Sequence, residues 1–199
     1  MPDPLVTRSI ELAGGPLRLL QPEESAELPD SGGVEWAPIA PYWSVLWRSG
    51  VALARELEGE ALGGLRVVEL GCGLAVPSIA AARAGAVVLA TDASDEALPL
   101  AARNAAENGA SIETAAVAWD EPDELVRRGP FDLVLAADVL YEDSAVTTLL
   151  SLLPRLAPTV WMADPGRPAA ADFLQRARPR WRAKTRRRGV VRIHRLRLS

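Results

Sequence analysis

The chain has 199 residues, of which 49% are apolar and 24% charged, and this length and composition predict one ordered globular domain. Its single cysteine, Cys72, excludes an internal disulfide and any metal site built from clustered cysteines. Its single histidine, His194, argues against most zinc arrangements and against a Ser-His-Asp triad, so we expect no metal. The first residues lack a basic region followed by an apolar stretch, and no apolar run is long enough to span a bilayer. We therefore expect a cytoplasmic protein.

The net charge of −4 is distributed unevenly along the chain. Residues 1–175 contain all 26 acidic residues and 11 of the 22 basic ones, a net charge of −15, whereas residues 176–199 contain the other 11 basic residues and no acid. A basic arm of this kind can bind nucleic acid, or it can form a hairpin that lies against the acidic body. Apolar residues recur through Val190–Leu198, which favours the hairpin and makes a nucleic-acid partner unlikely.

The N-terminal part of the chain predicts an extension that precedes the main sheet. Two short apolar runs, Leu5–Leu12 and Pro16–Leu20, flank a glycine pair and predict a β-hairpin. Residues 22–33 are acidic and contain two prolines and two glycines, which indicates a loop. Apolar residues at three- and four-residue steps then predict an amphipathic helix over Pro41–Leu57.

Strands and helices alternate in the remaining chain. We predict strands at Arg66–Leu70, Val87–Thr91, Ile112–Trp119, Phe131–Ala137 and Thr159–Met162. The predicted helices are Pro77–Ala84, a helix capped by Ser94 that extends to Asn108, and Ser144–Leu156. Arg180–Arg187 and Val190–Leu198 form a terminal antiparallel hairpin around Gly189. This order predicts a doubly wound, mostly parallel α/β sheet in one domain, with an N-terminal extension over residues 1–38 and a core over residues 39–199.

The most informative segment follows the first strand of this series. Gly71 and Gly73 stand one residue apart, where a ligand can approach the backbone closely. A phosphate-binding dinucleotide loop needs a third glycine three residues later, but that position is Val76, which argues against a nicotinamide-dependent dehydrogenase. The acid Glu69 precedes the loop instead, where it would attract a cationic ligand directly or through water.

Two further residues at strand ends complete the predicted ligand site. Asp92 ends the second strand, where a carboxylate can accept hydrogen bonds from both hydroxyls of a ribose, and Trp119 ends the third, where its ring can pack on adenine or belong to the core. Cys72, within the glycine loop, is interpreted as a small residue that offers backbone contacts and not as a nucleophile.

Together these residues resemble the motifs of the class I, or seven-stranded, methyltransferases. The matching segments are Gly71–Gly73, Asp92, Trp119 and Ala136–Tyr141, and the resemblance extends from about Ile39 to Leu174. Within this class the chain is most similar to methyltransferase family 16, which contains many protein lysine methyltransferases. Segments Pro41–Trp47 and Ala163–Arg167 most resemble the enzymes that methylate the β subunit of electron transfer flavoprotein.

This resemblance implies S-adenosylmethionine as the cofactor and a Rossmann-like sheet whose last strand is antiparallel. It implies cofactor contacts at Trp47, Gly71, Cys72, Gly73, Asp92, Trp119 and Ala137. It also brings Trp43, in the first of the two selective segments, close to the substrate.

The acceptor site is expected beyond the fourth and fifth strands. There Asp138 and Tyr141 are candidates for the catalytic residues that line the acceptor slot, with Asp164 and Arg167 nearby to bind substrate. Each has a structural alternative: Asp138 can cap the next turn, Tyr141 can pack, and Arg167 can pair with Asp164. We assign His194 no catalytic role and interpret three tryptophans as packing residues, namely Trp36, Trp161 and Trp181.

Three functions remain open from the sequence. The first is N-methylation of protein lysines, for which an acidic body favours a basic partner surface, whereas an arginine-rich end that projects near the slot favours an acidic partner. The second is N-methylation of a small amine such as nicotinamide, and the third is a nucleotide-binding module without catalysis. The fourth strand lacks an Asn-Pro-Pro-Tyr-type segment, which argues against nucleobase amines as acceptors.

Overall fold

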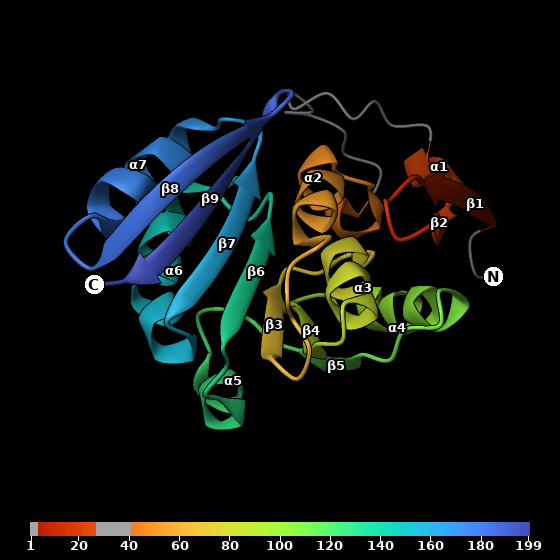
Figure 1. Cartoon of the computed structure of the whole chain (residues 1–199), viewed down its shortest axis with the longest axis horizontal. Helices are drawn as coiled ribbons and strands as arrows, with labels where there is room; N and C mark the ends of the chain where they lie inside the picture. The colour runs from red at the N-terminus through yellow and green to blue at the C-terminus, as the bar shows by residue number, and fades with distance from the viewer. Residues whose placement is uncertain (1–3, 27–40) are drawn as a thin grey trace.

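A computed structural model describes residues 4–26 and 41–199 of the chain (Figure 1). Its large sheet contains, in spatial order, β5 (Glu113–Ala116), β4 (Val87–Asp92), β3 (Arg66–Leu70), β6 (Leu133–Ala137), β7 (Thr159–Asp164), β9 (Val191–Leu198) and β8 (Trp181–Arg188). Neighbours from β5 to β7 are parallel, and β9 is antiparallel to both β7 and β8. The predicted doubly wound, mostly parallel sheet with an antiparallel end is confirmed.

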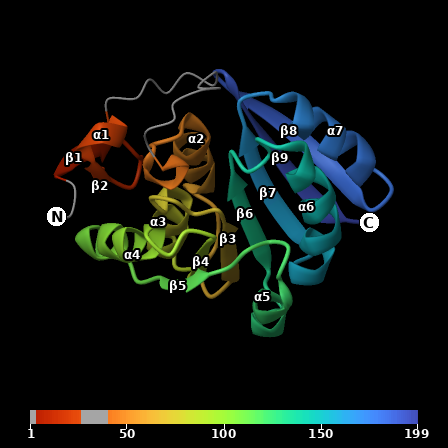
Figure 2. The same ribbon diagram turned by 180° about the vertical axis from the view of Figure 1, so that it is seen from behind.

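Helices cover both faces of the sheet, so the strands are buried on both sides. One face packs against α2 (Arg48–Leu57), α3 (Val76–Arg83) and α4 (Ala97–Glu107). The other packs against α5 (Asp123–Arg128), α6 (Asp143–Leu156) and α7 (Pro168–Ala177), of which α6 and α7 stand in front of the sheet in Figure 2. Alternate residues of β3 enter the two cores, Val67 the first and Val68 the second. This double burial explains the continuous apolar runs from which the strands were predicted.

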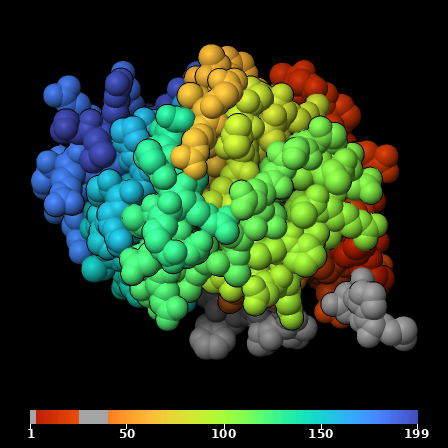
Figure 3. Space-filling view, turned by 90° about the horizontal axis from the view of Figure 1, so that it is seen from below, coloured from red at the N-terminus to blue at the C-terminus, as the bar shows by residue number. Residues whose placement is uncertain are grey.

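The order of the strands fixes where a ligand can bind. From the central strand β3 the chain moves outward to β4 and β5, and then returns to the other side of β3 to form β6 and β7. The carboxyl ends of β3 and β6 therefore meet at the point where the winding reverses, which is the ligand-binding position of open α/β sheets. At the opposite edge, seen from below, the loop between α2 and β3 (orange) lies between the β8–β9 side (blue) and the α3–α4 side (yellow and green) (Figure 3).

The predicted N-terminal hairpin is present and packs on α4. It consists of β1 (Leu5–Ile10) and β2 (Leu17–Pro22), and Leu17 and Leu19 are fully buried. The side chain of Asn104 pairs with the backbone of Leu20, accepting from its N–H at 2.7 Å and donating to its carbonyl at 3.1 Å. Asn104 of α4 thus satisfies backbone groups of β2 that a further strand would otherwise bond.

The acidic loop predicted at 22–33 needs a correction. Glu23–Ala26 forms a short helix, α1, whose first turn contains two of the acids, consistent with the preference of carboxylates for helix N-termini. Residues 27–33 of this loop, and Trp36, lie outside the described residues.

The helix predicted over Pro41–Leu57 was too long at its start. Tyr42–Ser44 forms a short 3-10 turn, η1, Val45 and Trp47 are extended, and α2 begins only at Arg48. The hydroxyl of Ser44 donates to the carbonyl of Pro41 at 2.7 Å, a local bond that competes with helix formation. The apolar spacing continues through this turn, which explains the error.

Other boundaries moved by one to three residues, and two further helices were missed. Ser94 does not cap α4, which begins at Ala97, because its N–H donates to the Asp92 carboxylate and its carbonyl accepts from Ala97. Helices α5 and α7 were not predicted; the first has only six residues, whereas the alanines of the second favour a helix. None of the helices in the described segments is long and apolar enough to cross a membrane.

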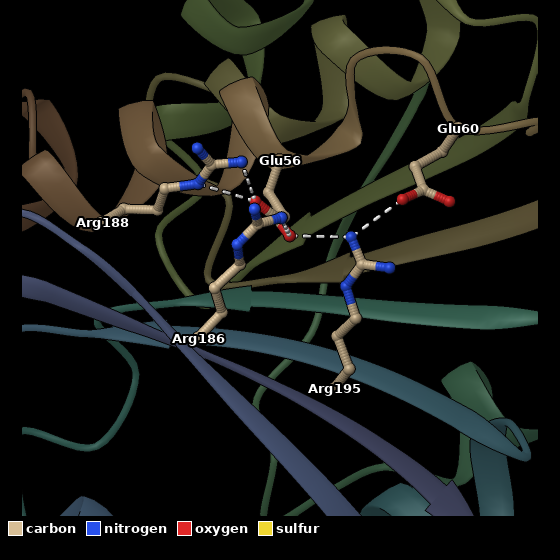
Figure 4. A network of polar contacts seen from close by, with 5 residues as sticks. All are labelled: Glu56, Glu60, Arg186, Arg188 and Arg195. Carbon is tan, nitrogen blue, oxygen red and sulfur yellow. Dashed lines mark hydrogen bonds and ion pairs between the residues drawn. The ribbon is translucent and has the colours of Figure 1, made fainter.

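The basic C-terminal segment forms the antiparallel hairpin β8–β9, as predicted, and a buried acid attaches it to the body. Glu56 of α2 is 2% exposed and pairs with Arg188 at 2.7 Å, Arg195 at 2.8 Å and Arg186 at 3.6 Å (Figure 4). Arg195 also pairs with Glu60 and stacks 3.7 Å above the ring of Trp161. Burial raises the pKa of Glu56, but the hydrogen bonds and charges of Arg188 and Arg195 outweigh burial and lower it. The interpretation of a basic hairpin against an acidic body therefore holds for these residues, and the packing assigned to Trp161 and Trp181, 7% and 4% exposed, is confirmed.

Candidate active site

The glycine loop follows β3 at the switch point of the sheet. Gly71 and Gly73 have φ angles of +64° and +48°, which glycine adopts without strain. A Cβ on Gly73 would lie 2.6 Å from the carbonyl oxygen of Trp43, and one on Gly71 would lie 3.3 Å from the ring of Trp119. The loop is therefore packed so tightly that only glycine fits. Two of the three tryptophans predicted for the site, Trp43 through its backbone and Trp119 through its ring, therefore lie against the loop.

Asp92 ties the end of β4 to this loop. Its Oδ2 accepts from the N–H of Gly73 at 2.9 Å and its Oδ1 accepts from the N–H of Ser94 at 2.9 Å. Each carboxylate oxygen has a further lone pair, so both can accept another hydrogen bond from a ligand. Asp92 is 9% exposed, which leaves little room for competing water.

Glu69 contacts the protein and not the open side of the site. The side chain is 1% exposed, and its Oε2 accepts from the backbone N–H of Ser78 at 2.8 Å and from the Ser78 hydroxyl. Burial and the nearby charge of Asp92 raise the pKa of Glu69 to about 8, although the bonds from Ser78 lower it. Its described contacts fasten α3 to β3, and the predicted contact with a cationic ligand stays a prediction.

Cys72 is buried in the loop, with its N–H donating to the carbonyl of Thr91 at 2.8 Å. Burial raises the pKa of the thiol well above its ordinary value, and the carboxylates of Glu69 and Asp92 add to the effect. A thiol of raised pKa is a poor nucleophile. This supports the interpretation of Cys72 as a small loop residue.

The predicted acceptor residues Asp138, Asp164 and Arg167 form one hydrogen-bonded group. Arg167 donates from Nε and Nη2 to Oδ1 of Asp138 at 2.8 and 2.7 Å, and the hydroxyl of Ser49 donates to Oδ2 at 3.0 Å. Asp138 has a φ of +60°, a conformation that non-glycine residues rarely adopt. A strained residue with both oxygens engaged is held in one orientation.

Asp164 connects this group to the terminal hairpin. Its Oδ1 accepts from the backbone N–H groups of Gly166 and Arg167, and its Oδ2 bonds to Nε2 of His194 at 2.9 Å. Nδ1 of His194 bonds in turn to the hydroxyl of Thr185 at 2.8 Å. Burial raises the pKa of Asp164, but the hydrogen bonds from His194, Gly166 and Arg167 lower it more, so the residue is held as a carboxylate. Both Asp164 and His194 are almost fully buried, so the described contacts of Asp164 hold the loop, and its predicted contact with substrate stays a prediction.

The alternative in which the side chain of Arg167 pairs with Asp164 is wrong. Asp164 bonds to the backbone of Arg167, and the guanidinium pairs with Asp138. Sequence reasoning missed two members of this group, Ser49 and His194. Neither has a sequence signal, because Ser49 is in the first turn of α2 and His194 depends on the register of β9 against β7.

Tyr141 is 60% exposed beyond the end of β6. Partial desolvation raises the pKa of its hydroxyl, and the carboxylates of Glu142 and Asp92 raise it further. Because the Asp92 carboxylate influences the pKa of Tyr141, the hydroxyl of Tyr141 lies near the predicted cofactor site. The packing alternative for Tyr141 has little support, because its ring is largely outside the core.

Two tryptophans lie in the segment before α2. The indole N–H of Trp47 donates to the carbonyl of Tyr42 at 3.1 Å. The buried indole N–H of Trp43 has no hydrogen-bond partner among the described residues, an unusual state that a ligand acceptor would relieve. Ala137 lies half-buried at the end of β6, beside Asp138.

A groove of about 560 Å³ lies between β1–β2, α2 and the β8–β9 turn. Four arginines line it, Arg8, Arg48, Arg55 and Arg188, together with apolar residues such as Leu46. None of the predicted site residues belongs to the described wall of this groove. The groove had no sequence signal, because its wall comes from segments widely separated in the chain.

Comparison with known proteins identifies the family. The sequence profile of a lysine methyltransferase family, methyltransferase family 16, matches residues 41–166. The chain belongs to this family. The predicted resemblance is therefore confirmed, and with it S-adenosylmethionine as the cofactor.

Individual relatives agree with this assignment. The protein N-lysine methyltransferase METTL21A of Danio rerio is 35% identical over 121 residues, 57% of this chain and 55% of that protein. The electron transfer flavoprotein β subunit lysine methyltransferase of Rattus norvegicus is 31% identical over 167 residues, 76% of this chain and 60% of that protein. The chain thus spans little more than half the length of these relatives.

Solved structures support the fold. The T. Thermophilus 16S rRNA N2 G1207 methyltransferase, solved with AdoMet and guanosine, matches with a TM-score of 0.69 at 16% identity, over 100% of this chain and 52% of that one. At this identity the likeness bears on the architecture alone.

Proposed function

We propose that the protein is an S-adenosylmethionine-dependent N-methyltransferase that modifies lysine ε-amines of a protein substrate. One observation carries the proposal: in a chain of this family, the glycine loop, Asp92 and the Asp138–Arg167 pair all follow strands that end at the same edge of the sheet. Lysine as the acceptor is supported by the description of the family and by the names of the relatives.

The residues at this edge fit the cofactor. The tight packing of Gly73 against the carbonyl of Trp43 fixes the position of the loop at the end of β3, and Asp92 has free lone pairs for two ribose hydroxyls. Trp119 stands against Gly71 with its ring available to adenine. We assign the remaining contacts to Trp47, Cys72 and Ala137, as the resemblance implies.

When bound, the cofactor would supply a methyl group on a sulfonium sulfur: the amine lone pair would attack the methyl carbon in line as the carbon–sulfur bond breaks, and the thioether would leave as S-adenosylhomocysteine. Positioning of the reactants and exclusion of water can lower the activation free energy of such a reaction by up to about 7–11 kcal/mol. The chain's main task is therefore to hold a neutral amine in place. A free lysine has a pKa near 10.4, so losing its proton at pH 7 costs about 4.6 kcal/mol.

Asp138 and Tyr141 divide this task in the proposal. Both oxygens of Asp138 already accept bonds from Arg167 and Ser49, so its carboxylate orients the amine through a remaining lone pair. The exposed hydroxyl of Tyr141 is the group best able to reach the amine or a water that accepts its proton. Trp43, with an unpartnered indole N–H, is assigned to the substrate side.

The proposal is tested by methyl transfer from labelled cofactor. Electron transfer flavoprotein β subunit is the first candidate acceptor, because the Pro41–Trp47 and Ala163–Arg167 segments resemble the enzymes that modify it. The purified β subunit and a cell lysate are each incubated with labelled S-adenosylmethionine, with Asp92→Ala as the matched control. Label is then assigned by mass spectrometry to protein residues or to small molecules.

Methyl-lysine that is formed by the wild type and lost in the control supports the proposal. Label only in a small amine moves the enzyme to the small-molecule class, and label on histidine or arginine contradicts the acceptor. A protein that binds S-adenosylmethionine but transfers no methyl group to either sample would contradict catalysis.

A further inference from the structure

Two exposed arginines of the terminal hairpin lie beside the acceptor site. Successive side chains of a strand point to opposite faces, so Arg186 and Arg188 face Glu56 whereas Arg187, between them, faces the other way. In the β8–β9 register Arg187 stands directly opposite Arg192, and both are exposed. Like charges in this position destabilise a sheet. Neither residue pairs with an acid in the part of the chain that the structure describes, so no described carboxylate offsets the repulsion.

The position of Arg192 connects this pair to the acceptor site. Arg192 stands opposite Asp164 in the β7–β9 register. A Cβ on Gly166 would lie only 3.1 Å from the guanidinium carbon of Arg192, so the guanidinium lies directly on the Asp164–Arg167 loop. The side chain of Arg167 from the same loop holds Asp138. Arg187 and Arg192 therefore border the site to which the acceptor amine is assigned.

We propose that Arg187 and Arg192 bind an acidic segment of the protein substrate, next to the lysine that is methylated. This inference rests on the proposed function. Guanidinium groups recognise carboxylates through two parallel hydrogen bonds, and one or two such carboxylates would relieve the repulsion between the arginines. Recognition of an acidic neighbour would add selectivity that the acceptor residues alone do not provide, because every exposed lysine presents the same amine.

An acidic protein segment fits this surface better than a nucleic acid does. Single-stranded nucleic acids bind to basic grooves with aromatic rings on which bases stack. The aromatic residues of the neighbouring strands, Trp161 and Trp181, are buried. Residues 1–175 carry a net charge of −15, which repels an extended polyanion such as a nucleic acid. A short acidic segment can contact the two arginines alone and meets less of this repulsion.

The test compares Arg187→Glu/Arg192→Glu with a matched control, Arg182→Glu/Arg197→Glu. The control residues also stand directly opposite each other in the hairpin and are exposed, but strand alternation puts them on the other face and register puts them at the far end. The probes are fluorescent peptides of equal length with one lysine, flanked by aspartates or by serines, and a single-stranded RNA. Binding is measured by anisotropy on the full chain with S-adenosylhomocysteine present, and methyl transfer to the lysine is measured separately.

We expect the acidic peptide to bind the wild type and the control at least about tenfold more tightly than the serine peptide, and the Arg187→Glu/Arg192→Glu variant to lose this preference. Equal binding of the two peptides, no binding of either, or an equal loss in the control overturns the inference. Tighter binding of the RNA assigns the surface to nucleic acid. If the charge reversal disturbs folding, as judged by circular dichroism, Arg187→Gln/Arg192→Gln gives the same comparison. The expected binding pattern without methylated lysine would refute the proposed function and leave the docking surface standing.

Discussion

Glu69→Gln should remove a large part of the pH dependence of the protein's stability. The carboxyl group of Glu69 is 1% exposed and accepts two hydrogen bonds from Ser78, while the charge of Asp92 lies close by. Glutamine has nearly the same shape, and its carbonyl oxygen can accept both bonds from Ser78. The substitution therefore removes the ionisation and keeps the packing.

The sign and size of the effect follow from the two pKa values. Burial raises the pKa of Glu69 from 4.5 to about 8, so between these values the folded protein holds a proton that the unfolded chain has lost. The free energy of unfolding therefore falls as the pH rises from 4.5 to about 8. At 1.36 kcal/mol for each pKa unit the full loss is about 5 kcal/mol, an upper limit because unfolded chains retain some structure.

The assay is urea unfolding of the wild type and Glu69→Gln at a series of pH values without cofactor. All other titrating groups are common to both proteins, so the difference between the two curves isolates Glu69. We expect Glu69→Gln to be similar to the wild type near pH 4.5 and clearly more stable near pH 8. Parallel curves over this range would refute the reasoning. Cofactor affinity of the same proteins adds a second result, because a marked loss in Glu69→Gln would support the predicted contact with a cationic ligand.

Three further predictions concern the ligand sites. Gly73→Ala should abolish measurable cofactor binding by calorimetry, because its Cβ would lie 2.6 Å from the carbonyl of Trp43; unchanged affinity would mean that the loop shifts freely. Asp92→Ala should weaken S-adenosylmethionine binding by about 1.5–3 kcal/mol, the range for a hydrogen bond to a charged group, and an unchanged calorimetric affinity in a folded variant would disprove the ribose contact. Tyr141→Phe and Asp138→Asn should lower turnover more than cofactor affinity, measured on the same preparations, and full activity in both would make these residues structural.

Much of the site could be predicted because parallel strands bring their carboxyl ends to one edge. Gly71, Asp92, Asp138 and Asp164 each end or follow a different parallel strand, and the sheet places all four strand ends side by side. The apolar runs of these strands are continuous because both faces of the sheet are covered by helices, and these runs allowed the strands to be predicted. Convergence of the residues then needed no knowledge of side-chain contacts.

Contacts set by strand register or by a single helix turn could not be predicted in this way. The sequence pattern places Glu56 on the exposed face of an amphipathic helix, yet the side chain is buried and pairs with three arginines. His194 bonds to Asp164 only because β9 pairs with β7 in one particular register, thirty positions later in the chain. The segment before α2 has helical spacing but extended backbone at Trp47, since a hydroxyl bond at Ser44 ends the first turn.

The terminal hairpin therefore has a closer relation to the acceptor site than its basic composition suggests. Through His194 it holds Asp164, whose other oxygen holds the loop that carries Arg167, and Arg167 holds Asp138 in a strained conformation. Both oxygens of this carboxylate already accept hydrogen bonds, from Arg167 and from Ser49, so its orientation is fixed. Within the proposed function, Asp138 therefore sets the direction from which the amine approaches, and desolvation of the amine and water near Tyr141 provide for removal of its proton.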